Sequence, residues 1–256
     1  MSENIHTELA SGVLRIEMRR PEKKNALTGP MYAAMADALE RAAREDAVRV
    51  VLIHGQPEVF TAGNDLGDFL DGPTDDPDRP VFRFLRNIAA AEKPLVAAVA
   101  GNAVGVGTTM LLHCDLVYAG ESARFQLPFV NLALCPEAAS SLLLPRLVGH
   151  PRAAELLFFG EPFGAAKAYE MGLANAIHPD AALLDAALER ARKLATLPAA
   201  SLRETKRLLK QSVAALVPQV MQAEGEIFTR QLASPEAKEA FSAFLQKRKP
   251  DFSKFG

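Results

Sequence analysis

The sequence predicts an α/β fold in which most strands are parallel. Short apolar runs at 48–54, 94–101 and 115–120 each end at or just before a glycine, which is typical of buried strands. Helical patterns alternate with these runs, and the short connections between them favour parallel pairing. After Glu137 the pattern changes, and helices are expected almost to the C-terminus. The first part of the chain is therefore expected to supply the sheet.

Each element has its own local signal. Residues 13–18 alternate like a strand with one buried face, and residues 31–44 are alanine-rich with apolar side chains at helical spacing. Helices are also expected at 81–91 and 107–114, and the proline- and aspartate-rich stretch 71–80 is expected to form a loop. The later helices are expected at 138–148, 151–159, 164–171, 181–196, 201–216, 217–233 and 236–247.

Composition excludes several classes of protein. The chain has 256 residues, 49% of them hydrophobic and 23% charged, as in a soluble globular protein. A net charge of -2 gives no electrostatic basis for nucleic-acid binding. No apolar run is long enough to span a membrane, and the N-terminus lacks the apolar core of a signal peptide. With only Cys114 and Cys135 and no disulfide framework, a cytoplasmic location is expected.

Standard catalytic motifs are missing from the sequence. It contains no GxSxG, GxxxxGK[ST], HExxH or CxxC, and Gly101, Gly105 and Gly107 do not make a dinucleotide-binding GxGxxG because Met110 follows at the third position. The five histidines are scattered, so no metal site is expected. Cys135 lies two residues before Glu137, but a buried structural thiol is favoured over a reactive one.

Two glycine turns share a design. Residues 61–66 (TAGNDL) and 104–108 (VGVGT) each follow a strand and lead into a helix. The N–H groups at the start of a helix lack intrahelical acceptors and lie at the positive end of its dipole. On neighbouring strands, two such turns would direct two N–H groups at one oxygen and form an oxyanion hole. Spacing alone leaves open that the glycines serve only tight strand-to-helix reversals.

Glu137 is the candidate proton carrier. Between Ala100 and Ser141 the other carboxylates are Asp115, favoured as a structural cap or ion-pair member, and Glu121, in a polar turn. Apolar flanks would raise the pKa of Glu137 and suit it to act as a general base. The alternative is a first-turn glutamate stabilised by the helix dipole. Taken alone, its position favours that alternative.

Three blocks of sequence resemble the enoyl-CoA hydratase/isomerase (crotonase) superfamily: RPEKKNAL, VRVVLIHGQPEVFTAGNDL and KPLVAAVAGNAVGVGTTMLLHCDLVYAGESARFQLPF. The resemblance covers roughly residues 13–180 in unbroken order. It implies a spiral of ββα units, acyl-CoA thioester substrates and a C-terminal helical region used in trimer formation. No separate cofactor is implied, because coenzyme A is part of the substrate.

The resemblance also assigns the site. The oxyanion-hole donors would be the backbone N–H groups of Asn64 and Val106, and the base would be Glu137. Residues implied to bind the acyl-CoA substrate are Lys24, Ala26, Ala62, Gly63, Asn64, Asp65, Leu66 and Gly105.

Departures from the family pattern indicate the reaction. Hydratases of the family use two glutamates, and the matching positions hold Thr109 and Phe129. LALCPEAASS instead resembles the SPEG block of Δ3,Δ2-enoyl-CoA isomerases, whose catalytic glutamate matches Glu137. Moving a double bond needs one base beside a stabilised dienolate, so isomerisation is favoured. Hydration or thioester hydrolysis, with Glu137 activating water, and a non-catalytic acyl-CoA-binding protein are the alternatives.

The resemblance divides the chain into two regions. Residues 1–195 are expected to form the spiral core with the acyl-CoA site, and residues 196–256 a helical oligomerisation region. The helices after residue 195 have no predicted strand left to cover, which favours contact with a neighbouring subunit over packing on their own core. A homotrimer or a dimer of trimers is expected.

Overall fold

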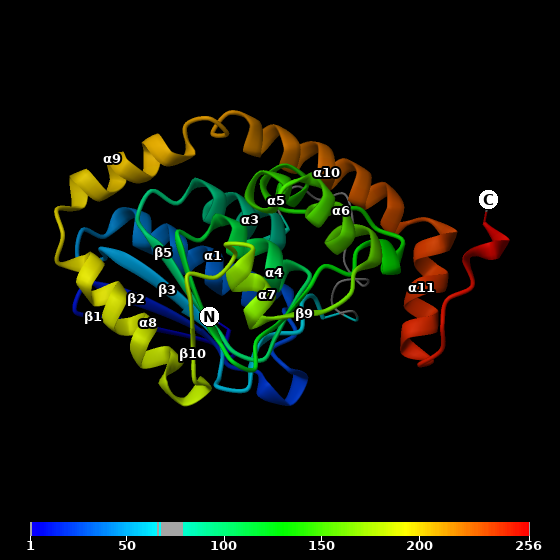
Figure 1. Cartoon of the computed structure of the whole chain (residues 1–256), viewed down its shortest axis with the longest axis horizontal. Helices are drawn as coiled ribbons and strands as arrows, with labels where there is room; N and C mark the ends of the chain where they lie inside the picture. The colour runs from blue at the N-terminus through cyan, green and yellow to red at the C-terminus, as the bar shows by residue number, and fades with distance from the viewer. Residues whose placement is uncertain (1, 66, 68–78, 256) are drawn as a thin grey trace.

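A computed structural model describes residues 2–65, 67 and 79–255. It has two sheets with helices packed around them (Figure 1). Almost all of the loop expected at 71–80, and the helix expected after the first glycine turn, lie outside the described residues. The predicted α/β class with mostly parallel strands is confirmed.

The larger sheet has six strands in the order β1-β2-β3-β5-β7-β10. They are β1 (Ile5–Ala10), β2 (Val13–Met18), β3 (Val50–His54), β5 (Leu95–Val99), β7 (Leu116–Gly120) and β10 (Ala176–His178). All neighbours are parallel except β1 and β2, which form an antiparallel pair. The strands expected from apolar runs are all present, whereas β1 and β10 were not predicted.

A second, smaller sheet has the order β4-β6-β8-β9. Its strands are β4 (Val59–Thr61), β6 (Asn102–Val104), β8 (Arg124–Gln126) and β9 (Phe163–Gly164). Three strand pairs, β3/β4, β5/β6 and β7/β8, each send the first strand to the large sheet and the second to the small one. Gly101 makes one of these switches with φ of +60°, and a Cβ there would lie 2.0 Å from the Glu58 carbonyl oxygen. These repeated pairs form the predicted spiral.

The helices agree with the sequence patterns to within a few residues at most ends. They are α1 (Gly29–Arg44), α3 (Pro80–Ala90), α4 (Val106–Thr109), α5 (Ser140–Val148), α6 (His150–Phe159), α7 (Ala165–Glu170), α8 (Asp180–Ala195), α9 (Ala199–Lys210), α10 (Leu216–Leu232) and α11 (Pro235–Leu245). The helix expected at 107–114 is α4 followed by a 3-10 helix, η2 (Met110–His113).

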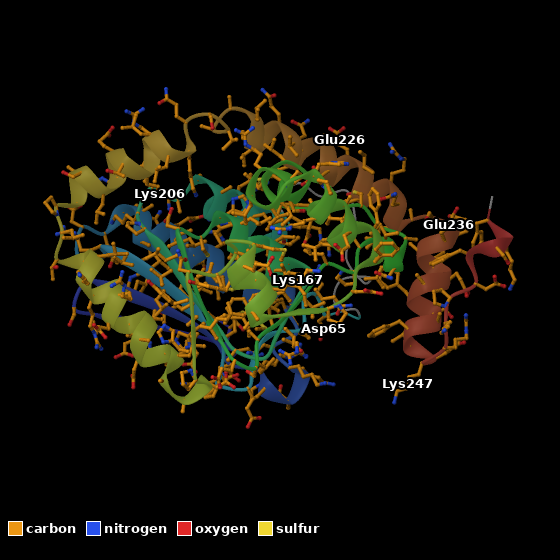
Figure 2. All side chains as sticks on the ribbon, in the orientation of Figure 1. Asp65, Lys167, Lys206, Glu226, Glu236 and Lys247 are labelled. Carbon is orange, nitrogen blue, oxygen red and sulfur yellow. The ribbon has the colours of Figure 1, made fainter. Side chains whose placement is uncertain are left out.

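Helices cover both faces of the large sheet. Leu183 and Ala187 of α8 pack with Leu52 and Val96 on one face, and the main core, with α1 and α3, lies on the other. α9 and α10 form an arch along one side of the molecule, and α11 ends beyond it (Figure 1). Figure 2 labels Lys206 and Glu226 on this arch. α8 ends at Ala195, and the expected division of the chain after that residue stays a prediction.

In the part of the chain that the structure describes, no helix combines the length and the apolar character that a membrane crossing needs.

Candidate active site

The two glycine turns lie side by side because β4 and β6, the strands that precede them, pair in parallel. The two turns approach so closely that a side chain would collide with the other turn at Gly63 or at Gly107. A Cβ on Gly63 would lie 2.9 Å from the Val104 carbonyl oxygen, and one on Gly107 would lie 2.5 Å from Cγ2 of Thr61. The glycines therefore serve a close backbone approach as well as a tight reversal.

Each turn presents an unused N–H group. Val106 is the first residue of α4, and neither its N–H nor that of Asn64 donates to an acceptor within the described residues. Gly105 precedes α4 with φ of 55° and ψ of -117°, a conformation that favours glycine, and its own N–H donates to the Gln126 carbonyl at 2.9 Å. The two N–H groups assigned to an oxyanion hole are thus available for a ligand.

The predicted coenzyme A residues cluster around the first turn. Ala62 N–H donates to the Lys24 carbonyl at 2.9 Å. Arg20 pairs with the Asp65 carboxylate at 2.7 Å and also donates to the Ala26 carbonyl at 2.9 Å. Lys24, Ala26, Ala62, Gly63 and Asp65 are therefore brought together, whereas Leu66 lies outside the described residues.

Asn25, which the sequence did not single out, organises this cluster. It is fully buried, and its amide group donates to the carbonyls of Val59 and Phe60 at 3.2 and 3.0 Å. Its own carbonyl accepts the Thr61 hydroxyl at 2.6 Å, and Thr61 Oγ1 in turn accepts the Gly63 N–H at 3.1 Å. Asn25 has φ of 52°, so the available signal was an asparagine in a loop, since asparagine tolerates the left-handed region.

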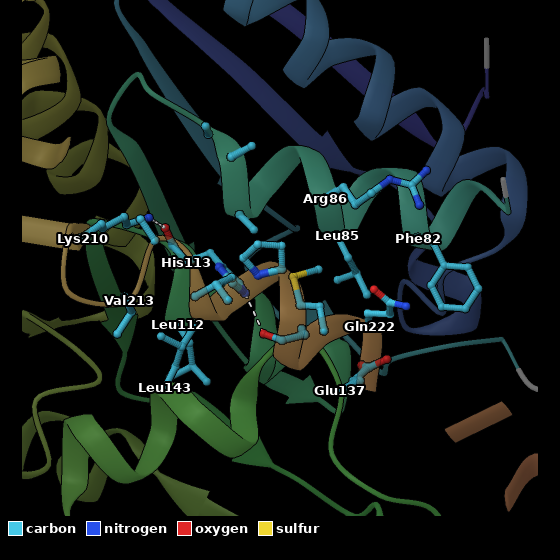
Figure 3. A pocket seen from close by; sticks show the side chains of 18 of the residues that line it. Phe82, Leu85, Arg86, Leu112, His113, Glu137, Leu143, Lys210, Val213 and Gln222 are labelled. Atoms are coloured by element: carbon cyan, nitrogen blue, oxygen red, sulfur yellow. Dashed lines mark hydrogen bonds between the residues drawn. The ribbon is translucent and has the colours of Figure 1, made fainter. Parts of the chain in front are cut away.

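A pocket of about 1340 Å³ lies between α3, η2 and the α9–α10 arch. Figure 3 shows Phe82 and Leu85 of α3, Leu112 of η2 and Leu143 of α5 around it, with the Glu137 side chain at one end. Of the predicted site residues that the structure describes, Glu137 alone lines this pocket; Asn64 and Val106 do not. Its mostly apolar wall suits a hydrocarbon chain or ring.

Glu137 sits in a turn that is held at several points. The Ser140 hydroxyl and N–H donate to the Glu137 carbonyl at 2.6 and 3.0 Å, and the ring N–H of His113 donates to the Ala138 carbonyl at 2.8 Å. By contrast, Oε1 of Glu137 is buried and has no hydrogen-bond partner among the described residues. A firmly held backbone thus carries a carboxyl with an unsatisfied oxygen.

The surroundings of Glu137 disfavour its charge. Burial raises its pKa to about 8, the nearby carboxyl of Glu224 reinforces the shift, and a hydrogen bond from the Thr109 side chain opposes it. Burial also lowers the pKa of His113 to about 4, so this imidazole stays neutral at physiological pH. With a pKa of about 8, Glu137 is mostly protonated at pH 7 and half-ionised near pH 8, a range in which one group can both take and return a proton.

Glu224 of α10 is a second buried carboxyl that sequence reasoning missed. It accepts hydrogen bonds from the backbone N–H groups of Ala139 and Ser141 at 2.6 and 2.9 Å. It lies more than eighty residues from Glu137 in the sequence, on a helix whose pattern gives no local signal for it. Only the folded chain brings the two carboxyls together.

The two positions that lack hydratase glutamates are both buried. Thr109 is fully enclosed in α4 and contacts Glu137, while Phe129 is part of the main core. Burial raises the pKa of the Cys135 thiol to about 11, so it stays protonated at neutral pH. Among the described residues no group of three or more metal-ligating side chains is present.

The spiral of strand pairs and the two facing glycine turns define the crotonase superfamily of acyl-CoA-processing enzymes, with which the structural neighbours agree. The chain belongs to the enoyl-CoA hydratase/isomerase family, whose sequence profile matches residues 8–254. The predicted membership of the enoyl-CoA hydratase/isomerase superfamily is therefore confirmed.

Relatives in this family carry out different reactions. The chain is 35% identical over 243 residues to the 2,3-dehydroadipyl-CoA hydratase of Escherichia coli, covering 94% of each protein. It is 32% identical over 253 residues to the enoyl-CoA delta isomerase 2 of Rattus norvegicus, covering 96% of this chain and 64% of that protein. A crystal structure of an enoyl-CoA hydratase/isomerase from Pseudoalteromonas atlantica is 44% identical and superposes with a TM-score of 0.94, covering 98% of this chain and 100% of that one.

Proposed function

We propose that this chain is a Δ3,Δ2-enoyl-CoA isomerase that uses Glu137 as its only acid/base group. The observation that carries the proposal is the Glu137 carboxyl, which lines an apolar pocket with one oxygen unpartnered and a pKa raised to about 8. A base near neutrality can take a proton and return it without a second titratable group.

The proposed reaction moves one proton from C2 to C4 of the substrate and shifts the double bond, with no net gain or loss of atoms or electrons. Glu137 removes a proton from C2 of a 3-enoyl-CoA, and the electrons move toward the thioester oxygen to give a dienolate. The N–H groups of Asn64 and Val106 stabilise that oxygen, since they have no acceptor among the described residues. The protonated Glu137 then donates the same proton to C4, and the double bond moves to C2–C3.

Hydration is the second candidate, because the chain is similar along most of its length to a dehydroadipyl-CoA hydratase. Addition of water across a double bond needs water to be held while a proton is delivered. Thr109 and Phe129 offer no second carboxyl for this task, and Phe129 lies in the core. Isomerisation therefore fits these residues better, and product analysis on 2-enoyl-CoA separates the two reactions.

The proposal is tested by Glu137→Gln, with conversion of 3-enoyl-CoA to 2-enoyl-CoA followed directly. We expect kcat to fall about 10³-fold, the range for loss of a general base. Glu226→Gln is the matched control, because Glu226 lines the same pocket and accepts a hydrogen bond from Gln222 at 3.1 Å. Near-wild-type turnover in the Glu137 variant would exclude this mechanism.

The substrate and the assembly complete the proposal. The acyl chain lies in the pocket beside Glu137, and coenzyme A binds along the cluster of Lys24, Ala26, Ala62, Gly63 and Asp65. We further propose a homotrimer, or a dimer of trimers, formed through residues 196–256. Several large apolar side chains are exposed in that region of the single chain: Leu197, Leu208, Leu209, Leu216, Ile227, Phe244 and Leu245. Light scattering after size exclusion measures the mass, and a monomeric mass would contradict this assembly.

A further inference from the structure

We propose that Glu224 of α10 is a positioning residue for Glu137, which holds the turn that presents the base and keeps a second negative charge behind it. The proposal rests on the proposed function only in taking Glu137 as the base.

The contacts of Glu224 form a helix cap supplied from another helix. Ala139 is the N-cap of α5, and its N–H and that of Ser141, in the first turn, donate to the two carboxylate oxygens of Glu224. The Ser141 hydroxyl is a third donor. N–H groups at a helix start lack intrahelical acceptors, and the positive end of the helix dipole favours an anion there. α10 therefore fixes the start of α5, three residues after Glu137.

The turn that Glu224 caps needs this support. Ala138 and Ala139 have φ of 58° and 55°, a left-handed conformation that is unfavourable for residues other than glycine. α5 follows directly, so releasing its first N–H groups would also release the left-handed pair. The Cys135 thiol donates to the Glu224 backbone carbonyl at 3.5 Å. Glu224 therefore contacts the chain both before Glu137, at Cys135, and after it, at Ala139 and Ser141.

Glu224 acts through the turn and through its charge. It is 6% exposed and is not among the residues that line the pocket. Both oxygens accept N–H groups, which fits the ionised carboxylate because a proton on either oxygen would compete with a donor. Burial raises the pKa of Glu224, while the three hydrogen bonds from Ser141 and Ala139 oppose that rise. The charge of Glu224 then disfavours ionisation of Glu137 and makes it a stronger base.

Other charged or titratable groups line the pocket from several elements. They are Arg79, Arg86, Glu92, His113, Arg203, Glu204, Lys206, Arg207, Lys210 and Glu226, and the Cys135 thiol lies on the same segment as Glu137. Of these, Lys210 donates to the His113 carbonyl at 3.0 Å and Glu226 is held by Gln222. Glu224 is the charged group that acts on Glu137 from directly behind the turn.

The test compares Glu224→Gln with Glu224→Ala, using Glu189→Gln as the control, because Glu189 is an exposed residue of α8 that does not line the pocket. Gln keeps an oxygen for the cap but removes the charge, so we expect the acid limb of kcat/KM to move down by on the order of one pH unit. Ala removes the cap as well, and we expect kcat to fall at least about tenfold with KM changed less, because displaced catalytic groups lose rate. An acid limb that stays in place in Glu224→Gln would overturn the proposal.

A second measurement remains valid if isomerase turnover is absent or if Glu224→Ala does not fold. Carbon-13 NMR of glutamate-labelled protein follows the carboxyl of Glu137, assigned by the signal lost in Glu137→Gln. A downward move of this titration in Glu224→Gln supports the positioning role even if the chain isomerises no substrate. An unchanged titration overturns that role and leaves the proposed function standing.

Discussion

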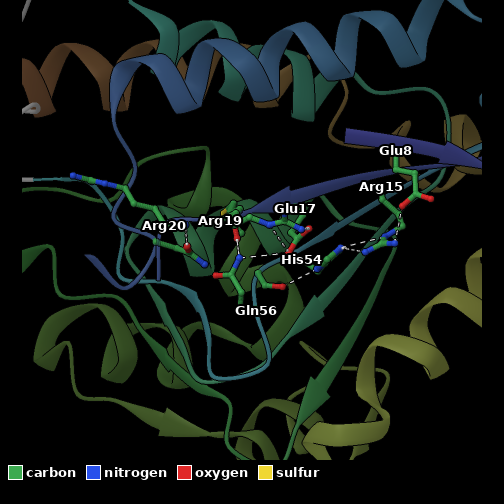
Figure 4. A network of polar contacts seen from close by, with 10 residues as sticks. Glu8, Arg15, Glu17, Arg19, Arg20, His54 and Gln56 are labelled. Carbon is green, nitrogen blue, oxygen red and sulfur yellow. Dashed lines mark hydrogen bonds and ion pairs between the residues drawn. The ribbon is translucent and has the colours of Figure 1, made fainter. Parts of the chain in front are cut away.

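Two polar clusters in this molecule differ in the charge of the groups that surround their carboxyls. One is the pocket pair, Glu137 and Glu224. The other is the sheet network, which lies on the β1-β2-β3 edge of the large sheet and consists of Glu8, Arg15, Glu17, Arg19, His54 and Gln56 (Figure 4). In the sheet network carboxylates meet arginines, with Glu8–Arg15 and Glu17–Arg19 distances of 2.9 and 2.8 Å. The pocket pair places two carboxyls near each other instead.

The difference appears in the pKa values. Burial alone would raise the pKa of Glu17, but the hydrogen bond and charge of Arg19, with a hydrogen bond from Gln56, bring it below its usual value. At Glu137 burial and the neighbouring carboxyl act in the same direction, and the pKa rises. A buried carboxyl with partners of opposite charge supports the fold, whereas one opposed by its neighbours is a candidate for proton transfer. We therefore expect changes near the pocket to affect rate and changes in the sheet network to affect stability.

The largest effect after loss of the base is expected at the contact between the two glycine turns. Gly107→Ala places a Cβ against Cγ2 of Thr61 and displaces the Val106 N–H while leaving both carboxyls intact. We expect kcat for 3-enoyl-CoA isomerisation to fall on the order of 10²-fold, the cost of losing one oxyanion-hole donor. Steady-state kinetics at a fixed pH measures it.

The same contact supplies a rescue experiment. Thr61→Ser removes Cγ2 but keeps the hydroxyl that donates to the Asn25 carbonyl and accepts the Gly63 N–H. We expect Thr61→Ser alone to be close to wild type and the double variant to recover much of the lost rate, a coupling that separate sites would not show. A double variant as slow as Gly107→Ala would contradict this account of the turns.

A smaller effect is expected in stability. The folded-state pKa of Glu137 lies above its unfolded value, so its favourable contribution is complete below about pH 4.5 and is lost as pH rises through about 8. Glu137→Gln cannot ionise, so we expect its free energy of unfolding to exceed that of the wild type by on the order of 1–3 kcal/mol at pH 8.

Urea unfolding at pH 4.5, 6.5 and 8 measures this difference, which should grow from the first pH to the last. Glu121→Gln, an exposed glutamate in a turn, is the control and should show no such trend. A destabilised Glu137 variant at pH 8 would mean that the carboxylate has a favourable partner in the fold.

The sequence predicted the large sheet better than the small one. The buried run of β3 has five consecutive apolar or enclosed residues and was evident, whereas β4, β6 and β8 have three residues each, too few to show a period. Glu137 was predicted as the base from its apolar flanks and its resemblance to a family block, and the structure places it in the wall of the pocket. Glu224 was not, because its role depends on α10 folding back onto α5 from a distant part of the chain.

The smallest effect is expected in the sheet network, at His54. Burial lowers the pKa of this histidine, Arg15 adds to the shift, and the hydrogen bond to the Gly55 carbonyl opposes it. Its Nε2 accepts from Arg15 at 3.4 Å and its Nδ1–H donates to Gly55 at 2.7 Å, so the folded protein holds the neutral ring. Because the folded-state pKa is depressed, the stability that His54 contributes is present above about pH 6.5 and is lost as pH falls.

We expect His54→Gln to lower the free energy of unfolding by about 1 kcal/mol at pH 8, and by less at pH 5, with kcat unchanged. His6→Gln, on the exposed face of β1, should show neither effect, and a pH-independent loss in His54→Gln would show that the folded protein does not discriminate against the charged ring.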